Sequence, residues 1–175
     1  MENIRKLCKI PDWIYPSWII SIALFLASAS YGYQAEILPV EKANIPMMEI
    51  YLNNMQMFLT NVSGVFFLGI PNLISGFLNG YAAGEALHSA TNAFGSSWIF
   101  KNFLPHGILE IPMIVLAVSF GMIPWIILYR KIRVPSQSMK KLFQESIKYL
   151  FTMICLAAAV LFIAAFIESY ISMHL

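Results

Sequence analysis

Five long apolar runs, separated by short polar segments, dominate this sequence. They cover residues 17–33, 50–70, 72–90, 106–129 and 148–170. A helix needs about 20 mostly apolar residues to cross the hydrocarbon core of a bilayer. The pattern therefore predicts an all-α protein, a single polytopic domain over residues 1–175 with five transmembrane helices in one bundle.

The composition agrees with this architecture. Hydrophobic residues make up 59% of the chain and charged residues only 11%, whereas a soluble domain carries about 25% charged residues. The net charge of +2 and the lack of a basic stripe argue against nucleic acid as a partner. The sequence has no Walker A loop and no GxGxxG motif, so any ATP involved must be handled by another subunit.

The basic residues predict how the chain is oriented in the cell membrane. Three Lys or Arg residues precede the first run, and six lie between Arg130 and Lys148. The segments expected on the other face contain only Lys42 and Lys101. Because cytoplasmic loops carry the excess of basic residues, we expect the N-terminus in the cytoplasm and the C-terminus outside.

Residues 134–147, between the last two runs, are amphipathic and basic. Lys140 and Lys141 alternate with apolar residues such as Phe143. Such a segment is expected to lie along the cytoplasmic membrane surface. It is also a candidate docking site, through Lys140, Lys141 and Phe143, for a separate cytoplasmic ATPase or other membrane subunits.

Gly76, Gly80 and Gly84 recur every four residues in the third run. On a helix they form one smooth stripe that allows a neighbouring helix to approach closely. Packing within the monomer is the favoured interpretation, and self-association into a homo-oligomer is the alternative.

Ionisable side chains inside a bilayer are costly and call for a partner or a water-filled cavity. The predicted topology places all the candidates in the outer half of the membrane: Glu85, His88, His106, Glu110 and Glu168. His106 and Glu110 are four residues apart and share one helix face, as do Glu85 and His88, which are three apart.

This convergence suggests two kinds of chemistry. His106, Glu110 and Glu85 are candidate ligands of a metal such as zinc, and His106, Glu110 and Glu168 are candidate catalytic residues. A proton-linked hydrogen-bond network is the other interpretation. The spacing differs from the His-Glu-x-x-His motif of known zinc helices. Structural alternatives are a buried pair joining two spans for His106 and Glu110, solvation for Glu168, and capping of the helix end for His88.

The segment from Leu104 to Glu110, Leu-Pro-His-Gly-Ile-Leu-Glu, resembles the Pro-His-Gly-x-x-Glu signature of the SpoIIM family, the stage II sporulation protein M-like membrane proteins. Asn53-Asn54, Gly69, Asn79-Gly80 and residues 164–171 add to the resemblance, which covers residues 15–172. It implies five spans in the cell membrane. It also implies roles for Asn54, His106, Gly107, Glu110 and Glu168, with Asn54 and Gly107 as packing residues, but it does not cover Glu85 or His88.

The resemblance implies no single function. The sporulation member works with cell-wall hydrolases in engulfment, whereas short relatives encoded beside circular bacteriocin precursors are associated with peptide maturation, export or producer immunity. The short chain favours the second group. We therefore expect a multi-pass subunit that handles a hydrophobic peptide together with an ATPase. The alternatives are an intramembrane metal-dependent peptidase or cyclase, and an engulfment scaffold.

Overall fold

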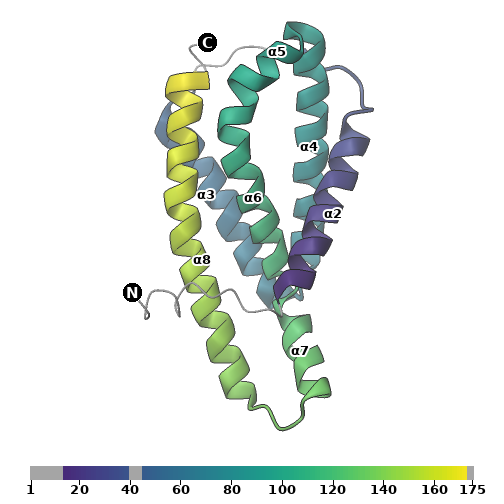
Figure 1. Ribbon diagram of the computed structural model, residues 1–175, viewed down its shortest axis with the longest axis vertical. Coiled ribbons are helices and arrows are strands. Elements are labelled where there is room, and N and C mark those ends of the chain that lie inside the picture. Colours follow the sequence, from purple (N-terminus) through teal and green to yellow (C-terminus); the bar gives the residue numbers. More distant parts are fainter. Residues whose placement is uncertain (1–13, 40–44, 173–175) are drawn as a thin grey trace.

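A computed structural model describes residues 14–39 and 45–172. Over these residues the protein is helical and contains no strand, which confirms the all-α prediction. Long helices run side by side in alternating directions (Figure 1): α2 (Tyr15–Gly32), α3 (Met47–Ser63), α4 (Ile70–Phe94), α6 (Leu104–Phe120) and α8 (Met139–Ile167). The three basic residues of the N-terminal segment and Lys42 lie outside the described residues.

Shorter elements join these helices. A 3₁₀ turn (Gly64–Phe67) follows α3, and α5 (Ser96–Trp98) with a π-helical turn (Ile99–Phe103) leads into α6. The chain continues from α6 into α7 (Ile123–Arg133), and a second π-helical turn (Glu168–Ser172) follows α8.

Two continuous helical stretches in the described part of the chain are long and apolar enough to cross a membrane. They are Ser96–Phe120 and Met139–Tyr170. Two of the other expected spans carry more strongly polar side chains: α3 contains Asn53, Asn54, Gln56 and Asn61, and α4 contains Glu85 and His88. Large apolar side chains are nevertheless exposed on α2, α3 and α4 as well, among them Ile19, Leu52 and Ile74.

Glycine and proline mark the boundaries between helices. Leu68 and Gly69, with φ of 54° and 77°, both adopt left-handed backbone angles and reverse the chain between α3 and α4. Pro71 then stands in the first turn of α4, where its missing N–H costs nothing.

The expected span over residues 106–129 is not one helix. α6 ends at Phe120, and α7 begins at Ile123, with Pro124 in its first turn. Proline cannot donate the backbone hydrogen bond that would continue the preceding helix. The side chain of Trp125 donates a hydrogen bond to the Leu68 carbonyl (2.9 Å), which ties this break to the α3–α4 turn.

The core lies between α3, α6 and α8, and it is built around aromatic rings. Phe58 of α3, Phe120 of α6 and Tyr149 of α8 pack edge to face, with ring centroids 5.8 and 5.9 Å apart. Such edge-to-face packing adds stability beyond the burial of apolar area.

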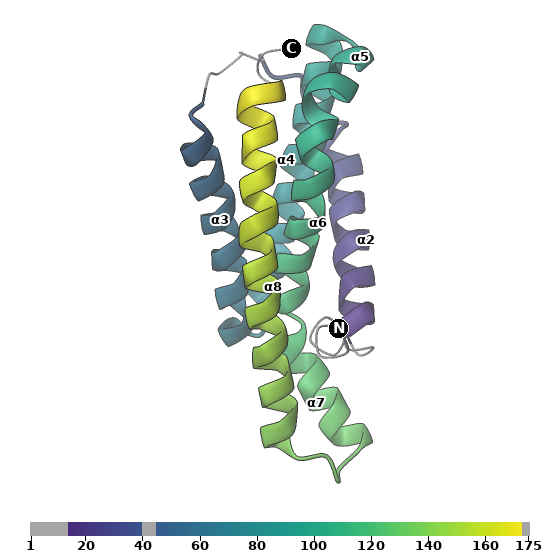
Figure 2. The same cartoon turned by 60° about the vertical axis from the view of Figure 1, so that its left-hand side comes forward.

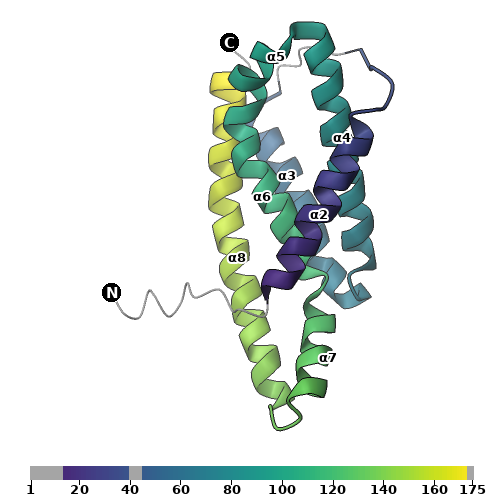
Figure 3. The same ribbon diagram turned by 45° about the vertical axis from the view of Figure 1, so that its right-hand side comes forward.

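The glycine stripe of α4 faces its neighbouring helices. α2 packs closely against α4 over its second half (Figure 3). A Cβ atom added at Gly80 or Gly84 would overlap α2, at Ser28 or at the Ala29 carbonyl, and one added at Gly76 would touch Val118 of α6. The structure therefore places the stripe inside the monomer.

Residues 134–147 differ from the separate surface helix that the sequence suggested. Residues 134–138 form a turn, and residues 139–147 are the first part of the 29-residue helix α8. Pro135 disfavours a helical conformation for the residue before it, which limits the helix to positions after the turn.

α7 and the start of α8 form a hairpin that extends beyond the other helices (Figure 2). Lys131 donates hydrogen bonds to the carbonyls of Pro135 (2.6 Å) and Gln137 (2.9 Å), which closes the turn. Arg130 of α7 and Glu145 of α8 form an ion pair at 3.4 Å. We call residues 123–148 the basic hairpin.

Candidate functional site

His106, Glu110 and Glu168 meet at one end of the bundle. Each side chain offers one nitrogen or oxygen atom that could bind a metal ion, and these three atoms all lie within 4.8 Å of one another. His106 and Glu110 come from the start of α6, and Glu168 opens the turn that follows α8. We call these three residues the His/Glu group.

Local sequence explains how α6 contributes two members. Pro105 stands in the first turn of the helix, where proline is tolerated. The four-residue spacing then places His106 and Glu110 one above the other. Gly107 is buried, and a Cβ atom there would lie 3.2 Å from the ring of Phe103, so glycine keeps this turn compact.

Two further residues fix the orientation of the group. The Asn54 side-chain amide of α3 donates a hydrogen bond to Oε1 of Glu110, and the His106 ring is hydrogen-bonded to the backbone of Asn102. The ring of Phe103 also packs edge-on against His106, with centroids 5.6 Å apart. Supporting hydrogen bonds of this kind typically orient the ligands of a metal ion.

The group has the composition of a zinc site with an open position. One imidazole and two carboxylates match the donor types that zinc accepts. Tetrahedral ligands at zinc distances are about 3.4 Å apart, so small side-chain rotations would close the group around an ion. Without an ion, two adjacent carboxyl groups can share a proton, which is the network interpretation of the same geometry.

Glu85 and His88 lie elsewhere on α4, and neither belongs to this group. His88 packs against the Tyr33 ring at the end of α2, with centroids 4.8 Å apart. Glu85 is partly buried. The structure thus joins His106 and Glu110 to Glu168, where the sequence had suggested Glu85 as the third ligand.

Lys140, Lys141 and Phe143, the candidate docking residues, are exposed on the basic hairpin. The hairpin projects from the end of the bundle opposite the His/Glu group (Figure 1). Docking at the hairpin and chemistry at the group would therefore take place at opposite ends of the protein.

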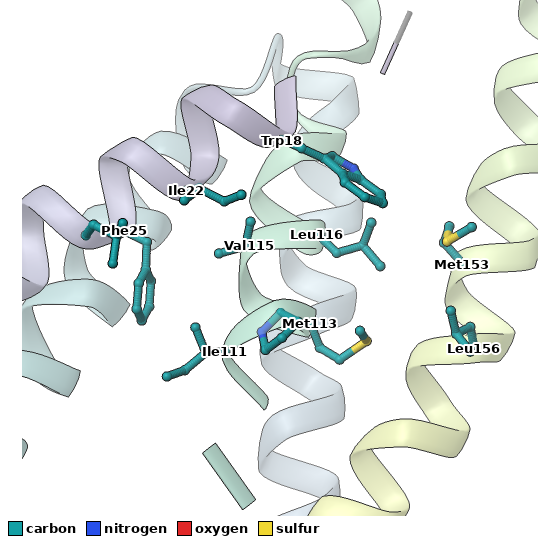
Figure 4. A pocket seen from close by; sticks show the side chains of 11 residues that line it. Trp18, Ile22, Phe25, Ile111, Met113, Val115, Leu116, Met153 and Leu156 are labelled. Carbon is teal, nitrogen blue, oxygen red and sulfur yellow. The ribbon is translucent and has the colours of Figure 1, made fainter. Parts of the chain in front are cut away.

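The sequence did not indicate an apolar cavity that opens between α2, α6 and α8. Its volume is about 400 Å³, and its walls include Trp18 and Phe25 of α2, Leu116 of α6 and Met153 of α8 (Figure 4). A second cavity of about 370 Å³ shares Phe25, Leu26 and Ile111 with it and continues along α2 to Tyr33. Together they form an apolar groove on one side of the bundle.

An apolar exterior around a partly buried His/Glu group is the arrangement of an integral membrane protein with a polar site between its helices. The family model for Stage II sporulation protein M matches residues 15–173, and the chain belongs to this family. Membership and the two apolar helices together indicate a membrane protein. No curated protein and no solved structure matches the chain.

Proposed function

We propose that this chain is a five-span membrane protein whose His/Glu group binds a divalent metal ion, zinc being the best match, and uses it to cleave or transfer a peptide bond. The observation that carries this proposal is the convergence of His106, Glu110 and Glu168 to within 4.8 Å. The supporting bonds from Asn54 and Asn102 add to it.

Two features support the five-span arrangement. α2, α3 and α4 lie alongside α6 and α8 (Figure 1), so a bilayer that covers the last two helices also covers the first three. The exposed apolar side chains on α2, α3 and α4 suit contact with lipid. Six basic residues lie on the basic hairpin and only Lys101 on the described opposite end, which favours a cytoplasmic hairpin and an outward-facing His/Glu group.

The proposed chemistry follows from the donor set. His106 and Glu110 would be ligands, and Glu168 would be a third ligand or a general base. A metal ion lowers the pKa of a bound water and so supplies a nucleophile near neutral pH. In peptide hydrolysis, Glu168 as the general base would take a proton from the attacking water and pass it to the leaving amine as the C–N bond breaks. In a cyclase, the amine of another residue would replace the water.

Metal analysis of the purified protein tests this proposal. We expect about one zinc per chain in the wild type and a loss of zinc in His106→Ala and Glu110→Gln. Glu85→Gln is the matched control, because Glu85 lies outside the His/Glu group, and it should retain the metal. Equal metal content in Glu110→Gln and the wild type, or no metal in the wild type, would exclude a metal-dependent reaction at this site.

A second candidate function is a membrane subunit that matures or exports a hydrophobic peptide, such as a circular bacteriocin, with a separate ATPase. The exposed Lys140, Lys141 and Phe143 on the basic hairpin favour it, and the apolar groove could accept an apolar segment. Purification from native membranes should recover ATPase activity with the wild type. Lys140→Glu/Lys141→Glu should lose it, and its retention would eliminate docking through these lysines.

A further inference from the structure

One face of α3 carries a line of exposed polar side chains. Asn53, Gln56, Thr60 and Ser63 are all exposed and follow one another at intervals of three, four and three residues. This spacing places them along a single stripe, with the periodicity of the contact line between two helices that cross at a shallow angle. We call these four residues the α3 seam.

The α3 seam borders a polar cavity of about 310 Å³ between α3 and α4. The lining residues are Asn53, Gln56, Met57, Thr60, Asn61 and Ser75. In the proposed five-span arrangement, these polar groups would lie on a surface of the bundle that faces lipid.

Hydrogen bonding in this cavity is incomplete. Asn61 is only 2% exposed. Its amide nitrogen donates to the Met57 carbonyl (3.0 Å) and to Ser75 Oγ (2.9 Å), but its Oδ1 atom has no hydrogen-bond partner among the described residues. A buried acceptor without a donor costs about 1–3 kcal/mol, so Asn61 adds polarity to the cavity wall, while the groups that a partner can reach are the exposed Asn53, Gln56 and Thr60.

The cavity is neutral, and its groups both donate and accept. The amides of Asn53 and Gln56 each carry an oxygen acceptor and two N–H donors. Ser75 Oγ already accepts from Asn61 and from Asn79 (3.1 Å), so its hydroxyl proton is available for donation. A neutral lining of this kind does not select a charged partner, and it is complementary to itself.

We propose that two copies of the chain pair in the membrane through the α3 seam, across a two-fold axis near Gln56. Equivalent amides then face each other, as a two-fold interface requires, and each copy supplies donors and acceptors to the exposed amides of the other. Asn and Gln side chains commonly hydrogen-bond between membrane helices, and small residues such as Thr60 and Ser63 allow close approach. The pairing depends on the proposed five-span arrangement but not on the metal site.

The glycine stripe of α4, the other candidate for self-association, is not available for this contact. Gly80 and Gly84 already pack against the backbone of α2. The α3 seam, in contrast, is exposed along its whole length.

Single-molecule photobleaching in phosphatidylcholine–phosphatidylglycerol vesicles tests the pairing. Each chain carries one dye on an added C-terminal tag. We expect two bleaching steps for the wild type and a rise of about tenfold or more in the dissociation constant of the dimer for Gln56→Leu. Gln144→Leu is the matched control, because Gln144 is an exposed glutamine of α8 that lies off the seam, and it should stay dimeric.

Disulfide cross-linking locates the contact. With the native cysteines Cys8 and Cys155 replaced by serine, Gln56→Cys should form a covalent dimer on oxidation in the membrane. Ile20→Cys, exposed on α2, should not.

Single bleaching steps for the wild type at every protein density, or an unchanged dimer in Gln56→Leu, would overturn the pairing. Zinc content is measured on the same samples. A monomer that still binds zinc would refute the pairing but leave the proposed metal site intact. A dimer without zinc would support the pairing and refute the metal site.

Discussion

Replacing Asn54 by leucine should weaken metal binding without removing a ligand. The Asn54 amide donates to Glu110 Oε1 and holds that carboxylate beside His106 and Glu168. Loss of a hydrogen bond that orients a metal ligand typically costs 10–100-fold in metal affinity. We therefore expect the zinc dissociation constant to rise by that factor, which is about 1.4–2.7 kcal/mol of binding free energy.

The neighbouring asparagine is the control. Asn53 has the same side chain, but it is exposed and lines the cavity between α3 and α4. Asn53→Leu should keep the zinc affinity of the wild type and lose dimer stability, whereas Asn54→Leu should do the opposite. Competition between the purified protein in detergent and a fluorescent zinc chelator measures the affinity. Equal affinities for Asn54→Leu and the wild type would show that Asn54 does not orient a metal ligand.

Three further predictions concern stability, each followed by thermal unfolding in detergent. Gly84→Val should destabilise the protein by about 1–3 kcal/mol because the added atoms overlap α2. Ala82→Val, at an exposed position of the same helix, should change the stability little. Equal melting temperatures for the two variants would disprove the close packing at Gly84. Leu68→Gly should stabilise the protein by about 1 kcal/mol, because glycine adopts the left-handed backbone angle of φ 54° without the steric cost that leucine has there. A melting temperature below that of the wild type would contradict this. A zinc chelator should lower the melting temperature of the wild type but not that of Glu110→Gln, and an equal drop in both would place the metal elsewhere.

The sequence was sufficient to nominate the three residues that the structure brings together in the His/Glu group. His106 and Glu110 follow from a four-residue spacing on one helix, and Glu168 follows from counting along the last apolar run. Depth alone does not say which helices are neighbours. Glu85 belongs to α4, which packs mainly against α2, whereas Glu168 follows α8, which packs against α6.

The sequence was less informative about where helices end. Residues 134–147 have the polar and apolar alternation of a surface helix, but nothing in that alternation shows that the helix continues through Lys148 into the last apolar run. Pro124 marks a possible helix break in the sequence, but prolines also occur inside membrane helices. Pro112 stands inside α6 without ending it. Only the surrounding packing distinguishes the two cases.

The uninterrupted helix α8 connects the two ends of the molecule. Its 29 residues span about 43 Å, from the basic hairpin to the residue before Glu168. A packed helix moves as a rigid element, so a displacement of the hairpin end of α8 along the helix axis would also displace Glu168 at the other end. The helix α8 is therefore a mechanical link between the basic hairpin and the His/Glu group.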